Sequence, residues 1–157
     1  MSKLTKKIQN DYEEFLVEID MLLEDLNELL ANSKHFKDQR VAYDDKSLDA
    51  IEDFYLKVLA GEEKVPISEA RMNRIIIAFY GEAVRERVGG VWELCTNEND
   101  TAFGLPVVAN WGEGVIAFSP VEVRDAQIRD RKPVIRERIN YFINKDEFEA
   151  NFFKEFE

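Results

Sequence analysis

Residues 71–95, RMNRIIIAFYGEAVRERVGGVWELC, mark the point where the chain changes from a helical to a strand pattern. In 71–88 the apolar residues recur on one side of a helix, with Ser68 as the cap before it and Gly89 as the residue that ends it. These apolar positions are Met72, Ile75, Ile76, Phe79, Ala83 and Val84. Residues 91–95 then alternate as in a half-buried strand. A central buried helix followed directly by a strand predicts an α+β fold.

A long amphipathic helix is predicted over 1–33, upstream of this central segment. Its apolar residues are spaced alternately by four and three positions, which gives a heptad seam. The seam consists of Ile8, Tyr12, Phe15, Ile19, Leu22, Leu26 and Leu29, and it is widened by Leu16, Leu23 and Leu30. Three lysines against eight acidic residues give the segment a net charge of −5. So wide an apolar stripe must be covered, either by the rest of the chain or by a second copy.

The remaining elements follow from turn residues and apolar spacing. A helix over 48–60 precedes the central helix, so that 47–88 forms a helical pair. Three strands make 91–119 an antiparallel meander, with Trp111 in the turn before the last strand. The expected strands are 91–95, 102–110 and 115–118.

Further helices fill 120–157, where Pro120 and Pro133 each open a helix and Asp146 caps another. We therefore predict a single domain over 1–157, in which the long first helix and the other helices pack on one face of a small three-stranded antiparallel meander.

Composition excludes several classes of protein. The net charge of −11 at pH 7 disfavours binding to nucleic acid or to an anionic membrane, whereas it speeds encounters with a basic protein. A single cysteine, Cys95, permits neither an internal disulfide nor a zinc cluster made of cysteines. The longest apolar run, 75–80, is too short to span a bilayer, and the N-terminus lacks the apolar core of a signal peptide. These features predict a cytoplasmic protein.

No motif for catalysis, metal binding or phosphate binding is visible, so we expect a protein that is not an enzyme and that carries no metal or cofactor. The only histidine, His35, has no serine, cysteine or carboxylate constellation beside it. Residues 97–100 resemble the start of a calcium loop. However, Ala102 stands where the EF-hand needs glycine, and Val108 stands where it needs glutamate.

Glu82 is the carboxylate with the most unusual surroundings, because it follows Gly81 inside a helix. A glycine there costs about 1 kcal/mol relative to alanine, which indicates that another element approaches closely. We expect Glu82 to be partly buried and to hold a strand backbone or the indole of Trp92. Together with Arg124, these two residues would line a pocket for a small molecule between the meander and the helices.

The second half of the chain resembles small bacterial domains of unknown function. The helix end YGEAVRERVGGVWEL (80–94) and the later VIAFSPVEV (115–123) carry the resemblance. The matching positions are Gly81, Glu82, Gly90, Trp92, Phe118 and Pro120, with Ser119 intervening before the proline. Some such domains are immunity-type proteins found beside bacterial toxins. The resemblance therefore implies a protein that binds another protein, although the acidic first helix lies outside the matched part.

Three functions are compatible with these patterns. The first is a non-enzymatic protein-binding module, which is immunity-like and covers a basic partner with acidic helical surface. The residues expected on that surface are Glu14, Glu18, Asp25 and Trp111. The second is a homo-oligomer assembled through the heptad seam, and the third is the small-molecule binder. The segment 124–138, with six cations and three acids, pairs either with the acidic helix or with a second copy.

Overall fold

The computed structural model describes residues 3–109 and 117–143, and these form an α+β fold. The elements in chain order are α1 (Lys6–Ala31), α2 (Asp45–Leu59), α3 (Glu69–Arg87), β1 (Val91–Leu94), β2 (Pro106–Ala109) and α4 (Pro120–Asp130). Residues 135–143 form a further helix that reaches the end of the described part. Within this part, no helix combines the length and the apolar character that crossing a membrane requires.

The helix starts follow the capping residues in the sequence. Ser68 is the N-cap of α3, as predicted, and its side chain accepts a hydrogen bond from the backbone N–H of Arg71. Ser119 caps α4 in the same way through the N–H of Glu122, and Pro120 follows it in the first turn. The helices predicted within the described residues are therefore present, with bounds within a few residues of the expected ones, whereas the helix expected after Asp146 lies outside the described residues.

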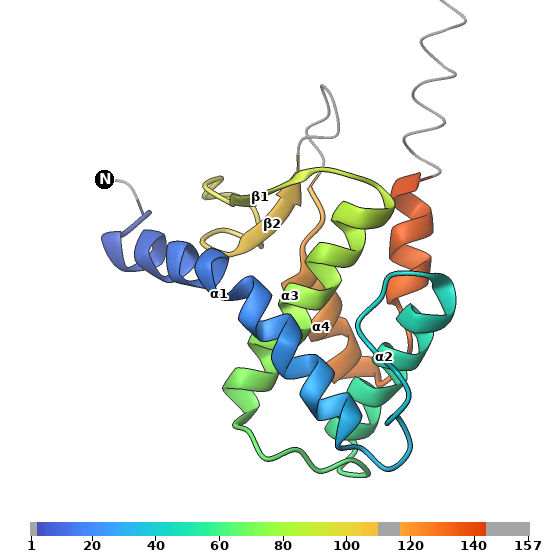
Figure 1. Ribbon diagram of the computed structural model, residues 1–157. Coiled ribbons are helices and arrows are strands. Elements are labelled where there is room, and N and C mark those ends of the chain that lie inside the picture. Colours follow the sequence, from blue (N-terminus) through green and yellow to red (C-terminus); the bar gives the residue numbers. More distant parts are fainter. Residues whose placement is uncertain (1–2, 110–116, 144–157) are drawn as a thin grey trace, which may run out of the picture.

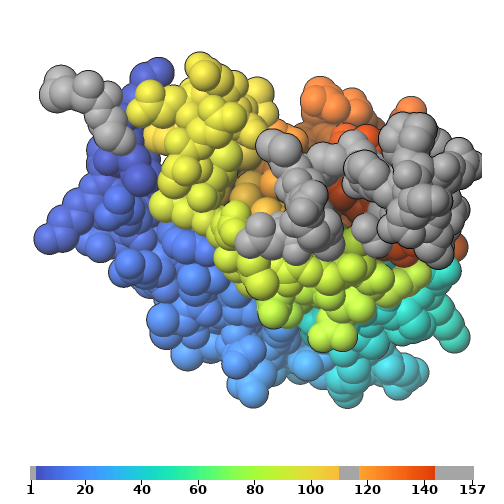
Figure 2. Space-filling view, turned by 90° about the horizontal axis from the view of Figure 1, so that it is seen from above, coloured from blue at the N-terminus to red at the C-terminus, as the bar shows by residue number. Residues whose placement is uncertain are grey.

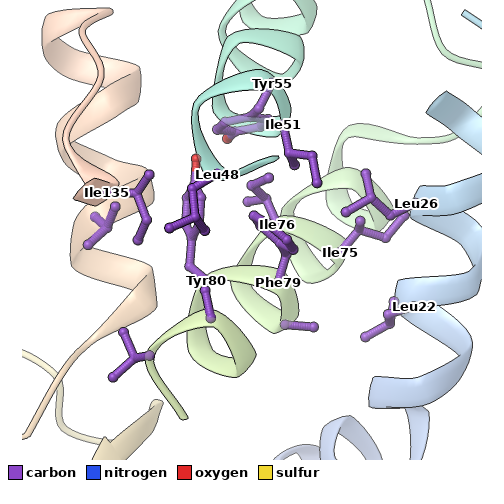
Figure 3. Packing of buried hydrophobic residues seen from close by; sticks show 14 of the residues in the cluster. Leu22, Leu26, Leu48, Ile51, Tyr55, Ile75, Ile76, Phe79, Tyr80 and Ile135 are labelled. Carbon is purple, nitrogen blue, oxygen red and sulfur yellow. The ribbon is translucent and has the colours of Figure 1, made fainter. Parts of the chain in front are cut away.

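Helix α3 is the centre of the fold and lies between α1 and α4 (Figure 1). Its Ile75, Ile76 and Phe79 are completely buried. The labelled side chains of α1 approach α3 from one side, and those of α2 approach it from the other (Figure 3). The hydrophobic core thus takes side chains from all the helices, which is why α3 is apolar on more than one face.

The seam of α1 is used inside the chain. Its buried residues are Phe15, Ile19, Leu22, Leu26, Leu29 and Leu30. They pack with α3 in the common core. Of the two covers predicted for the apolar stripe of α1, the structure therefore shows the rest of the chain. A homo-oligomer built on these residues would have to pull α1 away from α3.

The sheet is smaller than predicted. Strands β1 and β2 pair antiparallel, with Trp92 opposite Val108. In place of the third strand, the described residues show only an isolated bridge between Phe118 and Val108. Residues 115–116 and Trp111 lie outside the described residues, so the three-stranded meander is not confirmed.

The second strand also begins later than position 102. Residues 101–104 turn instead, because the side chain of Asp100 accepts a hydrogen bond from the N–H of Ala102 and Gly104 adopts a positive φ of 79°. The sequence between 95 and 106 therefore forms a connection and not a strand.

Candidate functional site

Helix α1 has an inner edge whose acidic side chains are neutralised by α3. Glu18 Oε2 lies 2.9 Å from Nη2 of Arg74 and 3.3 Å from Nη1 of Arg71. Asp25 Oδ2 lies 2.8 Å from Nη2 of Arg71. The sequence placed Glu18 and Asp25 on a partner-binding surface, whereas the structure places them in ion pairs within the chain. These pairs fix the orientation of α1 on α3.

Replacing Arg71 by glutamine is expected to lower the free energy of unfolding by about 1 kcal/mol, because it weakens two partly exposed ion pairs at once. Urea unfolding followed by circular dichroism measures the change. Arg129→Gln is the matched control, since among the described residues Arg129 pairs only with its exposed neighbour Asp130. A loss above about 3 kcal/mol would mean that Arg71 holds α1 in place far more strongly than an exposed pair can.

The outer face of α1 has the opposite character. Six of its acidic residues are exposed, and none of them makes an ion pair within the described part of the chain. They are Asp11, Glu13, Glu14, Asp20, Glu24 and Glu28. Between them lie two apolar side chains, Val17 and Met21, which are 84% and 57% exposed. We call these eight residues the outer α1 face. It includes Glu14, one of the residues expected on a binding surface.

The α1 residues form one edge of the molecule in the space-filling view (Figure 2). Val17 and Met21 are one helical turn apart, so their side chains are neighbours on that edge. Neither belongs to the heptad seam. This surface could have been predicted from the sequence, because Val17 and Met21 are apolar, lie off the seam and are surrounded by acidic residues. Sequence reasoning missed it.

Glu82 and Trp92 form a packed unit, as expected. The indole Nε1 of Trp92 donates a hydrogen bond of 2.8 Å to Glu82 Oε1, which also lies 2.7 Å from Nη1 of Arg85. The ring of Trp92 stands edge-on to Phe15 of α1, with 5.2 Å between centroids. A Cβ added at Gly81 would come within 1.9 Å of the indole, so the glycine is what allows the close approach. The Glu82 side chain is only 14% exposed.

The three residues expected to line a pocket, Trp92, Glu82 and Arg124, have different surroundings in the structure. The indole fills the space beside Gly81. Arg124 has a different set of neighbours, because it pairs with Asp125 at 2.7 Å and its charge acts on Tyr55 of α2. Trp111 lies in 110–116, outside the described residues. The structure therefore joins two of the three pocket candidates, and it joins them as packing partners.

The basic segment does not reach α1 through any ion pair of the described residues. Arg136 Nη1 lies 2.9 Å from Asp49 and its Nη2 lies 3.2 Å from Asp45, both in α2. Arg124 and Arg129 pair with the acid that follows each of them. The segment is thus paired mainly with itself and with α2, which leaves the outer α1 face without a cationic partner in the described chain.

A buried polar network, which sequence reasoning missed, joins α2 to α3, α4 and the last helix. Glu52 is 1% exposed, and its Oε2 accepts hydrogen bonds from Gln127 Nε2 at 2.5 Å, from the N–H of Val134 at 2.8 Å and from the N–H of Ile135 at 2.9 Å. The hydroxyl of Tyr80 lies 3.0 Å from Gln127 Oε1. Glu52 therefore caps the helix that begins at position 135.

Burial raises the pKa of Glu52 against the lowering effect of its hydrogen bonds, and burial also raises the pKa of Tyr80 well above its ordinary value. Such a carboxyl could serve acid–base chemistry, but one of its oxygens is committed to three structural hydrogen bonds. Among the described residues, no cluster of three or more His, Cys, Asp or Glu side chains is arranged to hold a metal ion.

Comparisons with protein-family models, with curated proteins and with solved structures give no match for this chain. The resemblance of the second half to small bacterial domains therefore stays a prediction.

Proposed function

We propose that the protein is a non-enzymatic binding module whose outer α1 face docks a basic protein partner. The observation that carries the proposal is the exposure of Val17 and Met21 in the middle of six acids that have no partner in the described chain. A solvated face does not need apolar residues, whereas a binding surface does.

The charges and the apolar pair have separate tasks in such an interface. The acidic residues, together with the net charge of −11, steer a basic partner toward α1 and set the association rate. Val17 and Met21 lose their water on contact and set the dissociation rate. A methionine side chain adapts its shape easily, which suits a surface that must fit against another protein.

The same charges argue against a symmetric dimer through this face. Two copies would bring like-charged helices together, and such juxtaposition costs several kcal/mol. The partner is therefore better described as a different, basic protein. An immunity-like role against a basic toxin would be one form of this interaction, in keeping with the resemblance of the second half. A cytoplasmic location belongs to the same proposal.

The experiment captures partners from native lysate on the tagged protein and compares two variants of equal charge change. Glu14→Lys/Glu24→Lys alters the outer α1 face. Asp38→Lys/Glu62→Lys alters two exposed acids elsewhere. We expect one basic protein to be retained by the wild type and by the second variant, and to be lost from the first. Retention by both variants would contradict the proposed surface, and recovery of only the bait would favour self-assembly.

The captured protein, once produced in pure form, allows the two tasks to be separated by surface plasmon resonance. Glu14→Lys/Glu24→Lys is expected to lower the association rate about tenfold at low salt, and this difference should shrink as salt is added. Val17→Ser/Met21→Ser is expected to raise the dissociation rate about tenfold, with little change in association. An unchanged dissociation rate would show that the apolar pair lies outside the interface.

A further inference from the structure

A cavity of about 580 Å³ lies between α2, the segment that links α2 to α3, and the end of α4. This volume falls in the range of small-molecule sites in proteins. Its apolar wall is formed by Val58, Leu59, Val65, Ile67, Met72 and Ile128. The cavity is distant in sequence from the outer α1 face and shares no residue with it.

Tyr55 is the most buried residue of the cavity lining, with 1% exposure. Its hydroxyl has no hydrogen-bond partner within the described residues. A buried hydroxyl without a partner is unfavourable, and native proteins leave few of them. Burial raises the pKa of Tyr55 to about 12, so the group stays protonated at neutral pH and is available as a donor.

The charges around Tyr55 favour an anionic acceptor at this place. Arg124 and Arg131 act most strongly on the hydroxyl, ahead of the opposing Asp125 and Glu69. Arg131 lines the cavity and stands at the end of α4 with φ of 55°. It is the only residue other than glycine with positive φ in the described chain, and this conformation is uncommon outside glycine, asparagine and aspartate.

The remaining charged residues of the lining do not cancel this preference. Lys64 adds a further cation to the lining. Of the acids, Glu63 already accepts a hydrogen bond from the Ser33 hydroxyl at 2.9 Å. Glu69 lies in the first turn of α3, where the unpaired N–H groups of the helix start offset its charge. A lining that combines an apolar wall with a hydroxyl donor and cations suits an amphipathic anion.

We propose that this cavity is a binding site for a small amphipathic carboxylate. Its apolar body lies against Val58, Ile67 and Met72, while the carboxylate accepts the hydrogen bond of the Tyr55 hydroxyl and pairs with Arg131. The ligand thereby satisfies the hydroxyl that the chain leaves without a partner.

The test titrates the full-length, ¹⁵N-labelled protein with octanoate and compares octanol as the uncharged probe. We expect saturable amide shifts at Gly61, Asn73 and Ile128, which line the cavity. Octanol is expected to bind about tenfold more weakly, because it lacks the charge that Arg131 recognises. The absence of saturable shifts, or shifts confined to other residues, would overturn the proposal. Equal affinity for octanol would overturn the assignment of a carboxylate.

Two variants test the polar contacts without disturbing the fold. Tyr55→Phe removes only the unpartnered hydroxyl, so its urea midpoint should not fall. Arg131→Gly removes the charge and keeps the left-handed backbone. Each is expected to weaken octanoate binding about tenfold, whereas Arg129→Gln, which alters an arginine outside the lining, should bind as the wild type does. Unchanged affinity in both Tyr55→Phe and Arg131→Gly would refute the site. These outcomes do not depend on the outer α1 face.

Discussion

Replacing Glu52 by alanine is expected to lower the free energy of unfolding by about 3 kcal/mol or more, which is one of the largest effects a single change in this protein should have. The carboxylate satisfies three buried or partly buried donors: the Gln127 amide and the N–H groups of Val134 and Ile135. Alanine removes the acceptor of the Val134 and Ile135 N–H groups, leaves Gln127 Nε2 with only its bond to the Tyr80 hydroxyl, and also opens a space between α2 and α4. Urea unfolding monitored by circular dichroism gives the difference.

Glu52→Gln separates the hydrogen bonds from the charge, because an amide oxygen can accept the same bonds. Burial raises the pKa of Glu52 above its ordinary 4.5, so ionising this group costs more in the folded than in the unfolded protein. The stability that a raised pKa provides is present below the unfolded pKa and is lost as the pH rises through the folded pKa. The wild type should therefore lose stability relative to Glu52→Gln as the pH rises above 4.5.

The measurement compares urea midpoints of the wild type, Glu52→Gln and Glu52→Ala between about pH 4 and pH 8. A gap between the wild type and Glu52→Gln that does not vary with pH would mean that the carboxyl ionises as easily inside the protein as in water. A Glu52→Ala variant as stable as the wild type would show that water, and not the carboxylate, serves the start of the last helix.

Gly81→Ala is the second change with a large expected effect, about 2 to 4 kcal/mol of lost stability. The new Cβ would lie 1.9 Å from the indole of Trp92. The indole is a side chain, but it cannot swing away freely, because Glu82 holds its Nε1 and Phe15 stands against its ring. Relief of the clash therefore requires that β1 move away from α3 or that the hydrogen bond to Glu82 break.

A double-mutant cycle shows whether the clash is the cause. Trp92→Phe shortens the ring, so the double variant Gly81→Ala/Trp92→Phe should be more stable than the sum of the single effects implies, by about 1 kcal/mol or more. Gly61→Ala is the control: it places a Cβ at a positive φ of 78° but meets nothing within 4 Å. Additive losses in the cycle would mean that Gly81 is needed for another reason than the approach of Trp92.

The elements that sequence reasoning predicted well are those that local patterns determine. The cap at Ser68 and the apolar spacing of 71–88 gave α3, and the seam from Phe15 to Leu29 gave the inner face of α1. The close approach of another element to Gly81 was also predicted, from a glycine inside an apolar helix, and the indole of Trp92 was one of the two partners predicted for Glu82.

What the sequence did not reveal depends on pairings between distant positions. Glu18 and Asp25 are exposed in a helix seen alone, and only the packing of α1 on α3 brings Arg71 and Arg74 to them. The Tyr55 hydroxyl is likewise seen to lack a hydrogen-bond partner only when α4 is packed in the folded chain. The third strand, expected over 115–118, is not confirmed, because residues 115–116 lie outside the described residues and Phe118 forms only an isolated bridge to Val108.

Glu52 is an exception among the features that were missed, because the sequence did indicate that its side chain is buried. It follows Leu48 by four positions and precedes Tyr55 by three, so it lies on the buried face of its helix. A charged residue on an apolar face is a polar group that must find partners in the interior. Which partners it finds could not be inferred, since Val134 and Ile135 lie more than eighty positions away.

The hydrogen bonds of Glu52 also bear on how small a piece of this chain can fold by itself. They join residues 82 and 83 positions apart, while the ion pairs of α1 reach forward to α3 across 46 to 56 positions. The two spans overlap from Glu52 to Arg74, which includes the second half of α2. Truncation on either side would therefore strip the remaining fragment of an interaction that it cannot replace. We therefore expect any fragment that folds by itself to need both α1 and the helix at 135–143.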